Sequence, residues 1–124
     1  MSEVKFNFED LKVYQKALEF ADIAYDLSSK FPNSEKYGLS SQFTRAAVSI
    51  ALNTAEGSGD SDPQFHRFLQ IAEGSVRECV TCCAIAFRRN YISELENNNA
   101  RNKLLELLKM IRSLQYYLKN KKSR

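Results

Sequence analysis

Apolar side chains recur along most of this chain at intervals of three and four residues, the spacing of one face of an α-helix. In the first such segment, one strip consists of Leu11, Tyr14, Leu18, Ala21 and Tyr25, and a second runs beside it through Val13, Ala17, Phe20, Ala24, Leu27 and Phe31. Together the strips cover roughly half of the helix, more than the usual apolar stripe of about 100°. We therefore expect something beyond the core of one subunit to cover the extra strip.

The pattern predicts four helices, over about residues 8–31, 34–57, 62–90 and 94–119. No segment shows the apolar and polar alternation that is typical of strands. Short connections between long helices favour antiparallel neighbours. We therefore predict an all-α fold, an antiparallel up-down-up-down four-helix bundle. It forms a single domain over residues 1–124, with a basic C-terminal tail at 119–124 that we expect to fray.

Residues suited to helix ends stand at the predicted boundaries. Asn7 is the expected N-cap of the first helix, and Asp62 that of the third, which has Pro63 in its first turn. Ser93 and Glu96 have the spacing of a capping box at the start of the fourth helix. These residues favour the same four segments as the apolar pattern.

The second predicted helix has few charges, because Arg45 and Glu56 are the only charged residues within 39–57. Such a helix is expected to be buried nearly all round. Arg45, Ser49, Asn53 and Glu56 are spaced by four, four and three residues and share one stripe. Buried polar groups need partners. We interpret the stripe as a structural polar network with partners on other helices or another subunit; a ligand site is the alternative.

The composition is that of an ordinary globular protein, with 44% hydrophobic and 27% charged residues in 124. No apolar run approaches the roughly 20 residues that cross a bilayer. The start, MSEVKFNFED, has acidic residues where a signal peptide needs a basic region and an apolar stretch. We expect a cytoplasmic protein without a membrane partner.

The charge is distributed unevenly along the chain. Residues 1–78 carry eight basic and twelve acidic side chains, whereas residues 79–124 carry ten basic and three acidic ones. Such asymmetry indicates either an anionic partner or a basic tail that only aids solubility.

The fourth predicted helix carries a stripe of basic residues. Arg101, Arg112 and Lys119 fall within about 20° of one another on a helix, and Lys109 and Tyr116 lie close by. Cations beside an aromatic ring can follow a phosphate backbone and stack a base. The alternative is a solvated face whose cations complement the helix dipole. The candidate nucleic-acid-binding residues are Arg101, Lys109, Arg112, Tyr116, Lys119, Lys121, Lys122 and Arg124.

The sequence offers weak candidates for a metal or redox site. Cys79, Cys82 and Cys83 all point to the apolar side of the third helix, and the single histidine, His66, lies on its polar face. Zinc would need further ligands. We interpret the cysteines as core residues and His66 as a surface residue, and we expect neither a metal nor a cofactor.

No catalytic constellation stands out either, so we expect a non-enzymatic protein. The segment GSGDSDP lacks the lysine and the preceding strand of a phosphate-binding loop. A small-molecule enzyme remains a third possibility. A solvent-open polar cavity between the second and third helices, lined by Arg45, Asn53, Glu56 and Glu78, would favour it.

Several short segments of the sequence are similar to those of a known protein family. They are FEDLKVYQKA at 8–17, FP at 31–32, EKYGLSSQFTRAAVSI at 35–50, NTAEGSG at 53–59 and FLQIAEGSVREC at 68–79. The chain resembles, over its whole length, the four-helix-bundle proteins encoded in intervening sequences of bacterial 23S rRNA genes. It differs at Ala51, where the family often has proline, and at residues 79–81, where a more polar tripeptide is usual.

The resemblance implies an antiparallel bundle that assembles as a ring, typically a homopentamer. Related bundles are accessory factors of diversity-generating retroelements, where they contact a reverse transcriptase and nucleic acid. The resemblance therefore implies a non-enzymatic oligomer that binds RNA or another nucleic acid. The alternative is a protein-interaction scaffold or accessory subunit, for example of a reverse transcriptase, without direct nucleic-acid binding.

Overall fold

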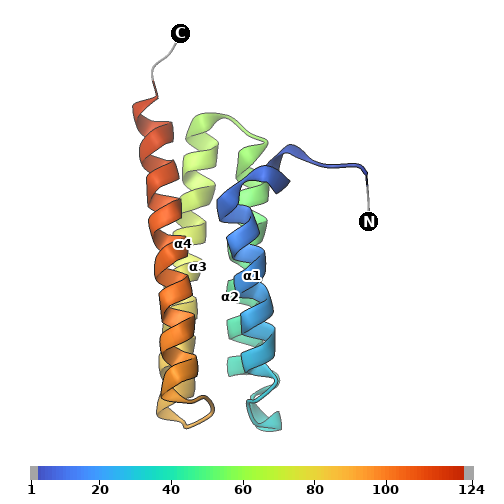
Figure 1. Ribbon diagram of the computed structural model, residues 1–124, viewed down its shortest axis with the longest axis vertical. Coiled ribbons are helices and arrows are strands. Elements are labelled where there is room, and N and C mark those ends of the chain that lie inside the picture. Colours follow the sequence, from blue (N-terminus) through green and yellow to red (C-terminus); the bar gives the residue numbers. More distant parts are fainter. Residues whose placement is uncertain (1–2, 122–124) are drawn as a thin grey trace.

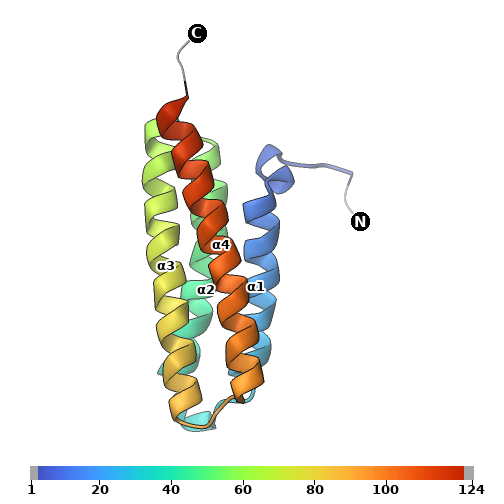
Figure 2. The ribbon, with the colours of Figure 1, turned by 60° about the vertical axis from the view of Figure 1, so that its left-hand side comes forward.

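The computed structural model describes residues 3–121, which form four long helices packed side by side (Figure 1). Two short 3-10 helices precede the first two long ones, and no strand occurs within the described residues. In chain order the elements are η1 (Asn7–Asp10), α1 (Lys12–Ser28), η2 (Asn33–Glu35), α2 (Leu39–Ser58), α3 (Asp62–Arg88) and α4 (Glu94–Asn120). Consecutive helices run in opposite directions, and α4 returns beside α1 (Figures 1 and 2). The predicted antiparallel four-helix bundle is confirmed.

The core receives large apolar side chains from all four helices. Phe20 of α1 and Phe43 of α2 are fully buried and meet edge to face, with ring centroids 6.1 Å apart. Leu69 of α3 and the α4 residues Leu104 and Ile111 are also fully buried. Burial of these side chains holds the helices together, since each contributes roughly 1.5–3 kcal/mol on leaving water.

The first long helix is shorter than the predicted 8–31 segment. Asn7 does not cap it, because residues 7–10 form η1 and α1 begins at Lys12. The Glu9 carboxylate accepts a hydrogen bond from the Phe6 amide at 2.8 Å, which favours a separate turn before α1. At the other end, α1 stops at Ser28, three residues before the predicted end.

The second helix also starts later than predicted, at Leu39 instead of residue 34. Glu35 explains the difference: one of its carboxylate oxygens accepts the Leu39 amide at 3.0 Å, and the other accepts the Tyr91 hydroxyl at 2.9 Å. The carboxylate thus caps α2 from the preceding turn. A contact with Tyr91, far along the chain, helps to hold it there.

The ends of α3 and α4 follow common capping patterns. Ser61, and not Asp62, caps α3, since its hydroxyl accepts the Gln64 amide. The α3 helix ends at Arg88, and Asn90, two residues further on, has the left-handed φ of 62° that commonly follows a helix end. The predicted capping box of Ser93 and Glu96 is confirmed, with reciprocal hydrogen bonds of 3.0 and 2.9 Å. The α4 helix continues to Asn120, and residues 122–124 of the predicted tail lie outside the described residues.

Burial of α2 is confined to one side. Phe43, Ala47, Ile50 and Thr54 face the core, whereas the opposite side is open. The prediction of a helix buried nearly all round is therefore wrong for a single chain. The physical reason is that α1 and α3 pack against the inner side of α2, and no described element covers its outer side.

An apolar surface, the outer α1–α2 patch, remains uncovered in the single chain. We define it by Leu18, Tyr25, Val48 and Leu52. Tyr25, Val48 and Leu52 line one shallow depression of about 290 Å³. Leu18 lies about two helical turns before Tyr25 on the same strip of α1. Leu52 is 60% exposed, Tyr25 56% and Leu18 44%. Leu18 and Tyr25 belong to the first of the two apolar strips predicted on this helix, whereas the second strip, from Val13 to Phe31, is buried in the core.

Candidate functional site

The candidate nucleic-acid-binding residues that the structure describes lie along α4 from Arg101 onward and, at Lys121, just beyond its end. Arg101, Lys109, Arg112 and Lys119 are all exposed, and Tyr116 is exposed by 72%. Lys121 follows the helix, whereas Lys122 and Arg124 lie outside the described residues. The α4 helix therefore presents a cationic row to solvent.

Two cations of this row are already paired with acids of α3. The Arg112 Nε donates a hydrogen bond to Glu73 Oε2 at 2.9 Å, and the same oxygen lies 3.2 Å from Arg77. The Lys121 ammonium lies 3.0 Å from Asp62. These ion pairs join α3 to α4, and they lower the positive charge that the row can offer to a ligand.

Glu73 is held ionised by its two arginines. Only 15% of its side chain is exposed, and this burial by itself would raise its pKa. The hydrogen bond and charge of Arg112, with the charge of Arg77, outweigh burial and hold the Glu73 pKa below its ordinary value. Arg112 is therefore a structural partner of α3 as well as a candidate binding residue.

Three cations of the row make no ion pair with any residue among 3–121: Arg101, Lys109 and Lys119. Each lies beside a different surface groove. Arg101 lies at the α3–α4 junction, Lys119 lies near His66, and Lys109 lies between α1 and α4. An anion could approach each of these ammonium or guanidinium groups from solvent.

The polar stripe of the second helix is only partly assembled into a network. Asn53 Nδ2 donates to the Ser49 carbonyl and hydroxyl at 2.8 and 2.9 Å, and Ser75 of α3 donates to the Ser49 hydroxyl at 2.9 Å. Arg45 and Glu56 are exposed, and no hydrogen bond or ion pair of the described residues includes them. The expected burial of these two charges is therefore wrong within one chain, because the outer side of α2 faces solvent.

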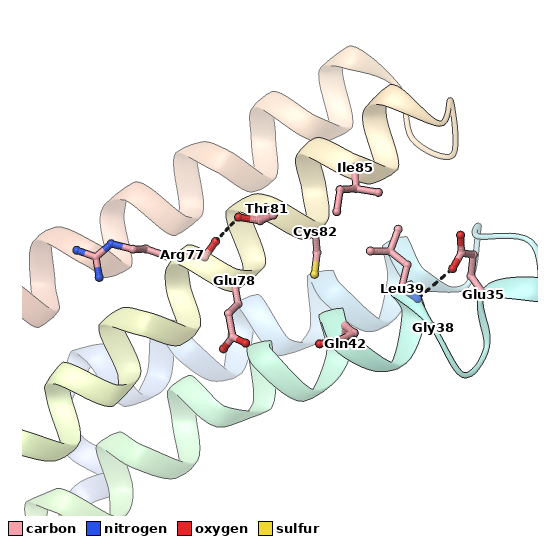
Figure 3. A pocket seen from close by; sticks show the side chains of 9 residues that line it. All are labelled: Glu35, Gly38, Leu39, Gln42, Arg77, Glu78, Thr81, Cys82 and Ile85. Carbon is pink, nitrogen blue, oxygen red and sulfur yellow. Dashed lines mark hydrogen bonds between the residues drawn. The ribbon is translucent and has the colours of Figure 1, made fainter.

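A cavity of about 580 Å³ lies between the start of α2 and the middle of α3 (Figure 3). Its wall includes the carboxylates of Glu35 and Glu78, and the Cys82 side chain points from α3 toward α2. Bonds from the Leu39 amide and then the Tyr91 hydroxyl lower the Glu35 pKa, so this carboxylate stays charged. The cavity lies between α2 and α3, where a polar cavity would have favoured a small-molecule enzyme. Of the four residues expected to line it, only Glu78 does so.

The three cysteines lie on the inner side of α3, as expected of core residues. All are buried and reduced. Burial raises the pKa of the Cys83 thiol to about 12 and that of Cys79 further still, so neither is a ready nucleophile or metal ligand at neutral pH. No cluster of three potential metal ligands occurs anywhere in the part of the chain that the structure describes. Over the same residues, no helix is both long and apolar enough to span a bilayer.

The fold and these surfaces define the class of protein: a small all-helical bundle with a cationic α4 and an open apolar face. The chain belongs to the 23S rRNA-intervening sequence protein family, whose pattern it matches over residues 9–113. It is similar in structure to a protein of unknown function from the S23 ribosomal protein family of Bacteroides thetaiotaomicron. The two share 26% sequence identity and a TM-score of 0.77 over 83% of this chain and 97% of the other. No curated protein matches the chain.

Sequence reasoning missed the partners of the basic row and the groove between α1 and α4. The i, i+4 spacing of Glu73 and Arg77 was visible in the sequence. Their contact with Arg112 depends on how α3 and α4 align. The groove is lined by Lys12 and Tyr117, neither of which was among the candidate binding residues.

Proposed function

We propose that this chain is a non-enzymatic, cytoplasmic helical bundle that binds RNA through the cations of α4. The observation that carries the proposal is the row of Arg101, Lys109 and Lys119, exposed and without an ion pair among the described residues, beside the exposed ring of Tyr116. Such cations attract phosphates, and an exposed ring can stack a base. The family's association with 23S rRNA intervening sequences agrees with an RNA ligand.

The test is the salt dependence of RNA binding. We would neutralise the three unpaired cations together (R101Q, K109Q and K119Q) and measure binding of a fluorescent RNA at several salt concentrations. Each lost phosphate contact lowers the slope of log affinity against log salt by about 0.7 for a single strand. We expect the triple variant to bind more weakly and to flatten the slope by about 2.

A matched control removes the same charge elsewhere. Lys36, Arg67 and Arg88 are exposed, lie outside α4 and make no ion pair with a described residue. The triple variant K36Q, R67Q and R88Q is expected to keep the slope of the wild type. Equal weakening by both triple variants would mean that net charge alone drives binding, and the assignment to α4 would be wrong.

We further propose that the bundle forms a homo-oligomer through the outer α1–α2 patch. Exposed apolar surface of this kind marks an interaction site, and Leu18, Tyr25 and Leu52 are each more than two-fifths exposed. The family resemblance suggests five copies. Copies that associate would also bring several α4 rows together and multiply weak contacts with one RNA.

The second candidate function is a protein-interaction scaffold, for example an accessory subunit of a reverse transcriptase. Two observations favour it: the outer α1–α2 patch is apolar, and Arg112 and Lys121 already neutralise acids of α3. A scaffold without direct RNA contact would show little RNA binding even at low salt. The salt titration therefore separates the two functions.

A further inference from the structure

A groove of about 480 Å³ separates the start of α1 from the second half of α4. Figure 2 shows that α4 diverges from α1 toward the C-terminal end of α4. The floor of the groove is apolar and includes Val13, Met110 and Leu114; its rim carries Lys12, Lys109 and Tyr117. A volume of this size falls in the range of sites that hold small ligands or single residues.

The two lysines of the rim are available to an anion. Both are exposed, and neither forms an ion pair within residues 3–121. The acids closest to them in sequence are engaged elsewhere, since Asp10 pairs with Lys5 at 2.7 Å and Glu106 lies 3.9 Å from Lys16. Lys12 and Lys109 therefore keep their charge for a ligand.

An aromatic ring completes the rim. Tyr117 is 57% exposed, and the Lys121 ammonium lies 5.7 Å from its ring centre. Lys109 and Tyr117 are eight residues apart on α4, or about 12 Å along the axis. The Tyr117 ring and two lysines that make no ion pair within residues 3–121 thus surround one apolar floor.

We propose that this groove is a subsite for single-stranded RNA, in which a base stacks on Tyr117 and the flanking phosphates contact Lys12 and Lys109. The inference rests on the proposed RNA binding, and adds to it the two residues Lys12 and Tyr117. The base stacks on Tyr117 because this ring lies in the groove. One stretch of the RNA strand therefore lies between α1 and α4.

The apolar floor of the groove is too small to hold an amphipathic helix of a partner protein. Val13 is only 4% exposed, and Met110 and Leu114 are half-buried. Little apolar area is left to bury, whereas stable protein interfaces cover roughly 800 Å² on each partner. Stacking needs a single exposed ring and is worth about 1–3 kcal/mol per base.

The test compares Tyr117→Leu, Tyr117→Phe and Lys12→Gln with the wild type. The probes are a fluorescent oligouridine and an abasic strand with the same number of phosphates. We expect Tyr117→Leu to weaken oligouridine binding about tenfold, the effect of 1.4 kcal/mol, and to leave abasic binding unchanged. Tyr117→Phe is expected to bind as the wild type does. Lys12→Gln is expected to flatten the salt slope by about 0.7 with both probes.

Tyr37→Leu is the matched control. Tyr37 is 88% exposed on the connection before α2, with Lys36 5.5 Å from its ring centre, so its surroundings resemble those of Tyr117. Binding by this variant should equal that of the wild type. Thermal melts of all variants establish that each is folded.

Two results would overturn the subsite and leave the proposed function in place. Oligouridine binding by Tyr117→Leu at wild-type strength would remove the stacking role and leave RNA binding by the α4 row intact. Equal losses for oligouridine and abasic strands would show that no base is read. If the wild type binds neither strand at low salt, the proposed function itself fails together with the subsite. Crosslinking of a 4-thiouridine strand to the peptide that contains Tyr117 gives an independent readout.

Discussion

Gly57, near the end of α2, packs directly against α3. A Cβ at this position would stand 2.7 Å from a ring carbon of Phe65 and 2.8 Å from the Cβ of Phe68. Both contacts are far shorter than van der Waals distance, and Phe65 is buried. A hydrogen is therefore the only side chain that lets the two helices pack at this separation.

We expect Gly57→Ala to lower the free energy of unfolding by about 2 kcal/mol, the usual effect of overpacking. Gly74→Ala is the control, because a Cβ there meets nothing within 4 Å. Alanine is the better helix former, so this variant should gain up to about 1 kcal/mol. Chemical denaturation measures both. A stable Gly57→Ala protein would mean that α2 and α3 can separate without loss.

Glu73 makes stability depend on pH. Its pKa lies below the value of about 4.3 in an unfolded chain, because Arg112 and Arg77 outweigh the effect of burial. The stabilisation is therefore complete above that pH and is lost as the pH falls through the lower folded pKa. We expect Glu73→Gln to cost about 1 kcal/mol at pH 7, and to differ little from the wild type at pH 3.

The control for this experiment is Glu19→Gln. Glu19 is exposed, and its contact with Lys16 is a loose 3.7 Å. We expect less than about 0.5 kcal/mol at either pH. If the Glu73 difference persisted at pH 3, the side chain would act through packing and not through charge.

Helix ends show what local sequence can and cannot predict. The capping box of Ser93 and Glu96 was predicted because both partners stand three residues apart. The start of α2 was missed because its cap, Glu35, is held by Tyr91, 56 residues away. Similarly, Ser61 and Asp62 are adjacent at the start of α3, and both are common N-cap residues. Only the structure shows that Ser61 is the cap.

At the scale of one element, we expect Ser93→Ala to destabilise the protein by about 1 kcal/mol. The Ser93 hydroxyl accepts the Glu96 amide at 3.0 Å, and loss of an N-cap typically has this effect. Ser113→Ala, at an exposed position inside α4, is the control and should leave the melting temperature unchanged or raise it slightly. An equal loss in both proteins would show that the cap contributes nothing.

For the whole molecule, the four helices followed from the apolar spacing, and their antiparallel order followed from the short connections between them. The sequence also indicated that the first helix has more apolar surface than one core covers, and Leu18 and Tyr25 are exposed accordingly. It could not show which cations are free. That depends on the alignment of α3 with α4 and on the divergence of α4 from α1, both of which are tertiary features.

The mass of the protein in solution tests the outer α1–α2 patch. We expect the wild type to be larger than one chain of 14.2 kDa, and Leu52→Glu to shift it toward that mass, because a charge would be buried without a partner. Light scattering at several concentrations measures this. Leu95→Glu, at a position 79% exposed on the first turn of α4, should keep the wild-type mass. A monomeric wild type would remove the patch as an interface.

The burial of the cysteines has a practical consequence. Cys79 and Cys83 are completely shielded within the bundle, so an alkylating reagent reaches them only when α3 parts from its neighbours. With excess reagent, the labelling rate at these two sulfurs reports how often the bundle opens, and mass spectrometry can follow it on the native cysteines. Binding of RNA or of a second copy of the chain would hold the helices together and slow this labelling. The same assay would therefore detect either partner.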